Sequence, residues 1–326
     1  MTEAGGGLGE DQTCTSDPQL TMPADVAALL HQALVYDSDE QLVACVAPFL
    51  RDGLAEGPTI AVLTRHHWSL LREELGSDAD GIAFTDCDDF YVRPVDALAA
   101  YDATISDLLA LGANSVRVTA ELPLQPTRGD WSEWISYEAI FNCATAHHAA
   151  NVLCVYGTET APDHVIDAVW RTHPHVEASA SVNRPDYQDP RDVVAAHSAE
   201  PASALELRAL APAADSMEFR ELLAAELKAT RAPQARVIDM LVAATEVFEN
   251  ARRHGGGARR VRTGLVDGWF VCEIEDRGPG LDDPLAGYLP PRPEQDRGTG
   301  LWVARRLVRR LELLHNPRGL AVRLWL

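Results

Sequence analysis

The chain has 326 residues, more than one compact domain usually contains, so two domains with a core each are expected. No apolar run approaches the roughly 20 residues of a membrane-spanning helix. The N-terminus also lacks the basic and apolar regions of a signal peptide, so a cytoplasmic protein without membrane segments is expected. The formal net charge of −21 argues against direct binding of DNA.

The six cysteines are dispersed, with no CxxC pair and no histidine at metal-ligand spacing, which favours buried free thiols over a redox or metal role. Adjacent His147 and His148 on one helix would point about 100° apart and would not chelate one ion easily. His173 and His175 flank a proline that indicates a turn. Structural roles are therefore favoured over metal binding for these histidines.

Residues 1–22 are rich in Gly, Thr, Ser and Asp without periodicity and are predicted to be a disordered leader. A first domain is predicted over residues 23–182, where segments of helical periodicity alternate with short β-branched runs. The predicted strands are 59–63, 82–85, 115–120 and 152–156, and the predicted helices are 40–53, 68–75, 95–111, 131–148 and 163–172. This alternation predicts an α/β fold with a mostly parallel sheet.

Parallel sheets place ligands beyond the carboxyl ends of their strands, which makes five residues candidates for lining a binding site. They are Thr64, Asp86, Glu121, Gly157 and Thr158. No GxxxxGK[ST] phosphate loop occurs in the chain. Its absence disfavours nucleotide hydrolysis by the first domain.

Four short motifs of this domain resemble the MEDS family, a sensory domain of methanogens and methylotrophs that also occurs in many actinobacterial regulators. The resemblance covers about residues 29–187. It rests on HQALVY at 31–36, PFLRDGL at 48–54, LCVYG at 153–157 and THP at 172–174. It implies that the domain senses a signal, either a small molecule or a protein, without identifying which.

Residues 183–203 contain three prolines among polar residues and are predicted to be a linker. The second domain is predicted over residues 204–326. Its predicted strands are 205–210, 261–266, 269–275 and 320–326, and its predicted helices are 212–230, 233–254 and 299–311. The Asp267-Gly268 pair predicts a tight β-hairpin between the two middle strands.

Three separated pieces of the second domain carry chemistry that suits one nucleotide site. Glu246 and Asn250 are four residues apart and share a helical face, where the amide oxygen can bind Mg²⁺ and the carboxylate can deprotonate an attacking hydroxyl. Asp276 ends a strand and can accept a hydrogen bond from the amino group of adenine. Residues 298–300, Gly-Thr-Gly, open a helix whose free backbone N–H groups favour phosphate.

In this order the three pieces resemble the N, G1 and G2 boxes of the GHKL ATPase superfamily, over roughly residues 203–326. The resemblance implies an α+β two-layer sandwich that binds ATP and Mg²⁺. It makes Glu246 the catalytic base, Asn250 the Mg²⁺ ligand and Asp276 the residue that recognises adenine. The residues implied for nucleotide contact are Gly278, Gly280, Gly298, Thr299 and Gly300. Arg297 either contacts phosphate or the protein substrate, or is an exposed lid arginine.

The compact second domain further resembles the bacterial anti-sigma factor serine kinases. Residues 283–287 and 297–303 look like those of RsbA-type regulators, which join such a domain to MEDS. This resemblance implies two partners, a sigma factor and a STAS-type anti-anti-sigma protein, with phosphorylation of a serine or threonine on the latter. A catalytically silent ATP-binding sequestration module is the alternative. A sensor histidine kinase is a third, disfavoured because the linker is short and His197 lacks a long apolar heptad context.

Two further features concern regulation. Residues 281–296, with four prolines, are predicted to be a short lid that closes over the nucleotide. A basic helix carries arginines that either meet an acidic partner or form a solvated charged face. These arginines are Arg305, Arg306, Arg309 and Arg310. The sequence leaves homodimerisation open.

Overall fold

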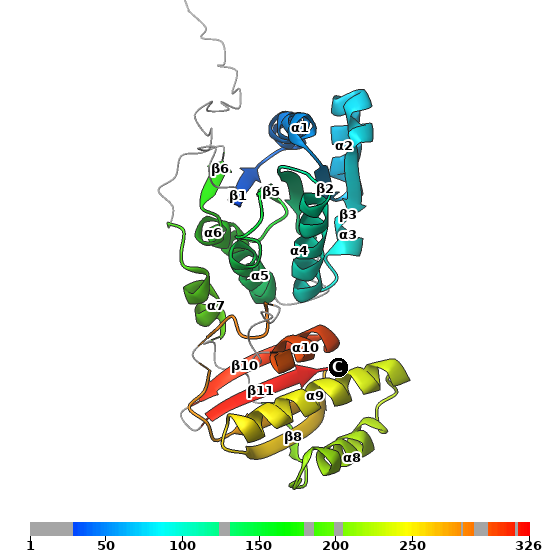
Figure 1. Ribbon diagram of the computed structural model, residues 1–326, viewed down its shortest axis with the longest axis vertical. Helices are drawn as coiled ribbons and strands as arrows, with labels where there is room; N and C mark the ends of the chain where they lie inside the picture. The colour runs from blue at the N-terminus through cyan, green and yellow to red at the C-terminus, as the bar shows by residue number, and fades with distance from the viewer. Residues whose placement is uncertain are drawn as a thin grey trace, which may run out of the picture.

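The computed structural model describes residues 29–123, 131–178, 186–198, 205–281, 283–289, 299–316 and 319–326. An α/β domain, blue to green in Figure 1, is followed by a second domain in yellow to red, and the two lie one above the other along the longest axis. The predicted leader 1–22 lies outside the described residues. Within them, no helix has the length and apolar character needed to cross a membrane.

The first domain contains a six-stranded sheet in which every strand pairs in parallel with its neighbours, in the order β3-β2-β4-β5-β1-β6. The strands are β1 Leu30–Tyr36, β2 Thr59–Leu63, β3 Ile82–Asp86, β4 Val116–Glu121, β5 Ala150–Gly157 and β6 His175–Ala178. The α/β fold with a parallel sheet is thus confirmed. The sequence prediction missed β1 and β6; β6 has only four residues.

Helices cover both faces of this sheet (Figure 1). They are α1 Asp39–Glu56, α2 Arg65–Leu75, α3 Cys87–Phe90, α4 Pro94–Ala110, α5 Trp131–Ala144 and α6 Asp163–Thr172, with the 3-10 helix η1 Gly76–Gly81. Strand residues alternate between two cores because successive side chains of a strand point to opposite faces. Ala33 and Val35 of β1 join the core under α4, α5 and α6, whereas Leu34 and Tyr36 join the core under α1 and α2.

A further helix, α7 Pro190–Ser198, lies inside the predicted linker 183–203. It packs against α5, and its Val193 and Val194 are buried in the core of the first domain. The sequence prediction treated Pro190 as a breaker. A proline suits the first turn of a helix, however, because the N–H it lacks has no partner there.

The second domain has a five-stranded antiparallel sheet in the order β10-β11-β9-β8-β7. Its elements are β7 Arg208–Ala209, α8 Ser216–Leu227, α9 Gln234–Arg253, β8 Ala258–Val266, β9 Trp269–Asp276, α10 Thr299–Leu307, β10 Arg310–Asn316 and β11 Gly319–Trp325. Helices packed on a sheet confirm the expected α+β architecture. The predicted hairpin also forms, with positive φ at Asp267 and Gly268.

Two boundaries of the second domain differ from the sequence prediction. The predicted helix 299–311 ends at Leu307, and residues from Arg310 onward form β10, in which Leu311 and Leu313 alternate into the core. The predicted strand 205–210 reduces to the two residues of β7. A short alternating run next to a helix is compatible with both helical and strand periodicity. Here the residues form a strand because β10 pairs with β11.

The two domains contact each other through α4, α5 and α7 on one side and α10 and β10 on the other. The Arg93 guanidinium donates to the carbonyl oxygen of Val308 at 3.0 Å, and Arg306 lies 4.0 Å from Asp96. Helix α7 also packs against β10. A groove of about 1390 Å³ lies beside these contacts and is lined by residues of both domains.

Candidate nucleotide site

Glu246 and Asn250 lie one turn apart on α9, opposite the first turn of α10, as their spacing predicted. Gly300 is what allows the two helices to approach. A Cβ atom built on Gly300 would stand 3.0 Å from Glu246 Oε2 and 3.0 Å from Asn250 Nδ2. A larger residue at this position would therefore push on both polar side chains.

Asp276 is the last residue of β9 and is held by backbone groups. Its Oδ1 accepts hydrogen bonds from the backbone N–H of Gly278 at 3.0 Å and of Leu320 at 2.9 Å. Among the described residues no donor is recorded for the other oxygen, Oδ2. That oxygen can therefore accept a hydrogen bond from a ligand.

Glycines surround Asp276 where a side chain would not fit. A Cβ atom on Gly255 would lie 2.6 Å from the Cβ of Asp276, and one on Gly319 would overlap the Asp276 carbonyl oxygen. Gly319 also has φ of +146°, a conformation that favours glycine. The sequence analysis did not assign these two glycines to the site. Gly255 could have been found, because it belongs to a Gly-Gly-Gly run after α9. No sequence pattern around Gly319 indicates that it belongs to the site.

A cavity of about 760 Å³ joins these groups. Four of the predicted site residues line it, namely Asn250, Asp276, Gly278 and Gly280. Apolar side chains of α9, β9, α10 and β11 form much of its remaining wall. They include Val247, Ile274, Leu301 and Val322. Beside Asp276 the cavity thus has apolar walls, an environment that suits a flat aromatic base.

Thr299 and Gly300 begin α10, whose first turn presents backbone N–H groups that are available to an anion. Thr299 is exposed. The other two residues expected here, Arg297 and Gly298, lie outside the described residues. The structure therefore places only the second half of the predicted phosphate segment.

Residues 283–289 belong to the predicted lid 281–296 and form one wall of the cavity. Leu285, Ala286, Gly287 and Leu289 line it. Leu285 is at the same time buried in the core of the first domain, and Leu289 packs against that core. Asp283 faces Arg191 of α7 at 3.8 Å. The nucleotide cavity and the first domain therefore share a wall.

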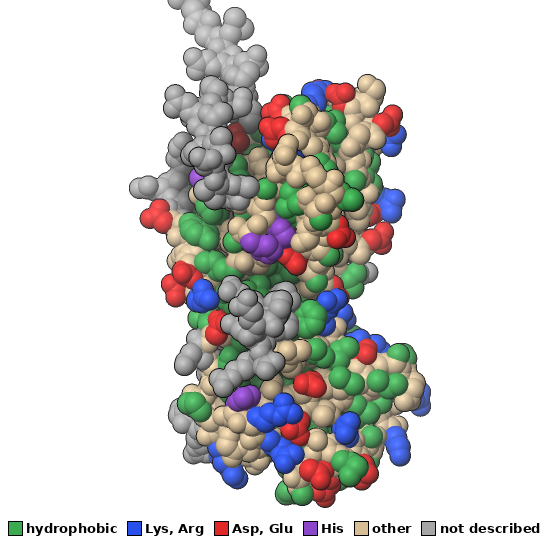
Figure 2. All heavy atoms as spheres, viewed as in Figure 1, with side chains coloured by type: hydrophobic (Ala, Val, Ile, Leu, Met, Phe, Trp, Pro, Cys, Tyr) green, Lys and Arg blue, Asp and Glu red, His purple; other side chains and the backbone are tan. Residues whose placement is uncertain are grey.

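The predicted basic helix does not present all of its arginines to solvent. Arg305 is only 7 % exposed, stacks on the Tyr288 ring at 3.6 Å from its centroid, and donates to the Ala286 carbonyl. Arg310 lies 3.4 Å from Glu133 of the first domain. Figure 2 shows basic side chains gathered on the second domain with acidic ones among them. Two of the four arginines, Arg305 and Arg310, therefore make contacts within the protein.

The predicted lining residues of the first domain separate into two groups. Glu121 is buried, and its Oε2 accepts from the Thr64 backbone N–H at 2.9 Å and lies 2.8 Å from His67 Nδ1. Gly157 sits against the Tyr36 hydroxyl in the same region. Asp86, by contrast, caps α3 and pairs with an arginine, and Thr158 is exposed. The sequence analysis did not single out His67 or Tyr36.

His67 is the titratable group of this cluster. Burial lowers its pKa, but the hydrogen bond and negative charge of Glu121, with Asp39 nearby, outweigh burial and raise the pKa above 6.5. Burial also raises the pKa of Tyr36, so its hydroxyl stays protonated. At the carboxyl end of β4, Glu121 therefore favours the protonated form of His67.

Comparison with protein families finds a separate match for each half of the chain. Residues 30–174 match the family model described as the MEthanogen/methylotroph, DcmR Sensory domain, or MEDS. Residues 210–326 match the model of the histidine kinase-like ATPase domain, which implies that this domain binds ATP. No curated protein matches the chain. The chain therefore joins an N-terminal MEDS sensory domain to a C-terminal histidine kinase-like ATPase domain.

Proposed function

We propose that this protein is a signal-responsive anti-sigma regulator. Its second domain binds ATP with Mg²⁺ and a sigma factor, and it phosphorylates a serine or threonine of a STAS-type anti-anti-sigma protein. The observation that carries the proposal is that Asp276 and Asn250 line one cavity, while Glu246, one turn from Asn250 on α9, faces the first turn of α10 beside it. The first domain, which detects the signal, alters that cavity through the wall that they share.

Each group of the site has a separate role in binding the nucleotide. Asp276 Oδ2 accepts a hydrogen bond from the amino group of adenine, and the apolar walls of the cavity enclose the adenine ring. The amide oxygen of Asn250 would hold Mg²⁺, which would supply positive charge to balance that of the phosphates. Backbone N–H groups at the start of α10 hold phosphate oxygens.

Glu246 is placed to act as the general base. Its Oε2 lies beside the first turn of α10, where the terminal phosphate would be held. It takes the proton of the substrate hydroxyl while the oxygen forms a bond to the γ-phosphorus. The bond between that phosphorus and the bridging oxygen breaks, and ADP leaves.

The connection between the domains supports this proposal over a sensor histidine kinase. A histidine kinase requires a helical dimerisation segment with an accessible phosphoacceptor. Among the described residues between β6 and β7 there is one nine-residue helix, α7. The apolar residues of α7 are not available for a dimer interface, because Val193 and Val194 are buried against the first domain.

Phosphotransfer from labelled ATP tests the proposal. In the presence of sigma factor and anti-anti-sigma protein, Glu246→Gln should retain ATP binding and lose transfer by about 10²- to 10⁴-fold, the usual contribution of a general base. Glu249→Gln is the matched control, since Glu249 lies on the same helix but pairs with Arg252, whereas Glu246 faces Gly300 at the start of α10.

Three other outcomes distinguish the alternatives. Binding of a sigma factor without transfer to any anti-anti-sigma protein would identify a silent sequestration module. Acid-labile label on a histidine of the chain itself would identify a histidine kinase. Full transfer by Glu246→Gln would refute the assignment of the base.

A further inference from the structure

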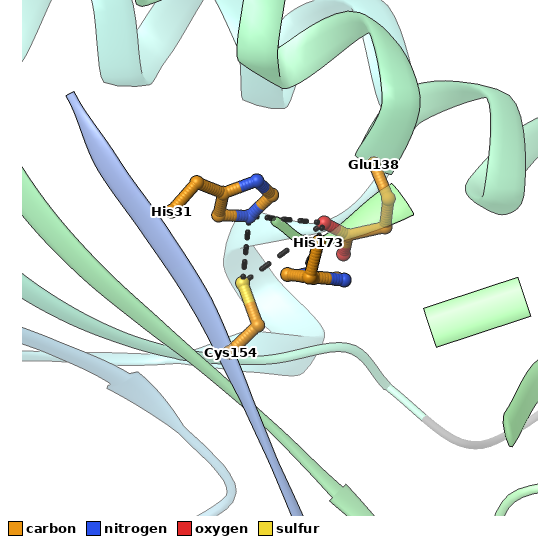
Figure 3. Close-up of side chains that lie close together, drawn as sticks. All are labelled: His31, Glu138, Cys154 and His173. Carbon is orange, nitrogen blue, oxygen red and sulfur yellow. Dashed lines mark hydrogen bonds and ion pairs between the residues drawn. The ribbon is translucent and has the colours of Figure 1, made fainter. Parts of the chain in front are cut away.

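Four side chains from separate parts of the first domain converge in its interior (Figure 3). His31 comes from β1, Glu138 from α5, Cys154 from β5, and His173 directly follows α6. All four are buried, with exposed fractions of 2 %, 5 %, 6 % and 1 % respectively. The sequence analysis favoured structural roles for the cysteines, which lack a partner at metal-ligand spacing, and for His173, which precedes a proline that indicates a turn.

The ligand atoms of the four all lie within 4.8 Å of one another, and three of the separations below equal those of a tetrahedral metal site. Glu138 Oε2 lies 3.5 Å from His31 Nε2 and 3.6 Å from His173 Nε2. Cys154 Sγ lies 3.4 Å from His31 Nε2 and 3.9 Å from Glu138 Oε2. A tetrahedron with bonds of about 2.1 Å to nitrogen and oxygen and about 2.3 Å to sulfur has edges of about 3.4 to 3.6 Å. A small ion therefore fits between these atoms with little adjustment.

Hydrogen bonds behind the histidines fix which ring nitrogen carries the proton. The Asn142 amide nitrogen donates to the carbonyl oxygens of Glu138, Ala139 and Thr172, so its Oδ1 must face His31. His31 Nδ1 lies 3.0 Å from that oxygen and therefore donates to it. Its Nε2 is left with a lone pair directed at the cluster.

His173 is oriented in the same way. Its Nδ1 lies 3.0 Å from the Val169 carbonyl oxygen, which can only accept, so Nδ1 donates. Its Nε2 is buried without a hydrogen-bond partner and points toward Glu138. A buried lone pair with no donor is costly, and a metal ion would satisfy it.

We propose that His31, Glu138, Cys154 and His173 bind one Zn²⁺ ion. A thiolate and a carboxylate together carry two negative charges, which balance the charge of the ion and leave a neutral buried site. Two imidazoles, one thiolate and one carboxylate in tetrahedral arrangement suit zinc better than Mg²⁺ or Ca²⁺, which prefer oxygen ligands.

The position of the site suggests what it does for the domain. The ion would cross-link β1, β5, α5 and the end of α6, which are far apart in the chain. Helix α5 also carries Glu133, which contacts Arg310 of the second domain, and it packs against α7. Zinc would thus hold the helix that connects the interior of the sensory domain to the ATPase domain.

The test is metal analysis of the full-length protein after incubation with Zn²⁺ and removal of free metal by gel filtration. Wild type should retain about one zinc per chain, and Cys154→Ser and His173→Gln should lose most of it. Cys143→Ser and His147→Gln are matched controls that should keep it. Exposed His147 belongs to a second cluster, with half-buried Asp102 and buried His148, so it also reports adventitious binding.

Replacement by Co²⁺ keeps the proposal testable if a variant fails to fold. Wild-type protein with Co²⁺ should show the visible bands of a tetrahedral site and a near-ultraviolet thiolate-to-cobalt band. Zinc should compete for both, and it should protect Cys154 from alkylation. A wild-type protein that retains no zinc and gives the spectrum of hydrated Co²⁺ would overturn the proposal.

Discussion

Replacing Asp276 by asparagine changes one atom of the nucleotide site while keeping its shape. The two backbone N–H groups of Gly278 and Leu320 already donate to Oδ1. They fix the orientation of an asparagine too, because turning its amide nitrogen toward them would set donor against donor. The amide nitrogen must therefore take the place of Oδ2, the atom expected to accept from adenine.

The expected loss follows from that exchange. A hydrogen bond to a charged group contributes about 1.5 to 3 kcal/mol, so ATP binding should weaken about 10- to 150-fold. Guanine carries a carbonyl oxygen where adenine carries its amino group, and the asparagine can donate to it. The preference for ATP over GTP should therefore narrow in Asp276→Asn, an effect that general damage to the fold would not produce.

Isothermal titration with non-hydrolysable ATP and GTP analogues measures both effects. Asp267→Asn is the matched control, since it makes the same exchange at an exposed hairpin position where asparagine tolerates the positive φ. Its nucleotide affinities should equal those of wild type. Unchanged affinity of Asp276→Asn for both analogues would refute the assignment of Asp276 to the base.

Two further predictions concern backbone and pH. Gly319→Ala should lower the unfolding midpoint and weaken ATP binding, because the alanine Cβ would overlap the Asp276 carbonyl. Gly257 has φ of +100° and open space around it, so Gly257→Ala measures only the cost of placing alanine at a positive φ. Denaturant unfolding should show Gly319→Ala less stable than Gly257→Ala by about 1 to 3 kcal/mol, and equal stability would contradict the overlap. The raised pKa of His67 means that its pairing with Glu121 stabilises the fold fully below pH 6.5 and less as pH rises through that raised pKa. The stability difference between wild type and His67→Gln should therefore shrink above pH 6.5, and a constant difference would contradict the ion pair.

Local spacing was enough to predict the parts of the nucleotide site that lie on one element. Glu246 and Asn250 share a face because they are four residues apart in a helix. Asp276 was found because it ends a strand. Gly319 could not be found in this way. It meets Asp276 only because β11 pairs with β9, where Ala321 stands opposite Glu275.

The same limit explains the buried cluster of the first domain. His31 and Cys154 are 123 positions apart, and no local pattern joins them. They become neighbours because β1, the first strand of the domain, lies between β5 and β6, its last two strands. The sequence analysis favoured a buried free thiol for Cys154 and did not consider His31 as a ligand, whereas their common chemistry appears only when the sheet order is known.

The shared wall of the cavity indicates how a signal could reach the nucleotide. Leu285 is buried in the sensory core and lines the cavity. Asp283 faces Arg191 of α7, and α7 packs on α5. A signal that favours one packing of α5 and α7 would therefore move the lid residues against the nucleotide. Coupling of this kind is reciprocal, so ATP must change the affinity of the first domain for its signal by the same factor.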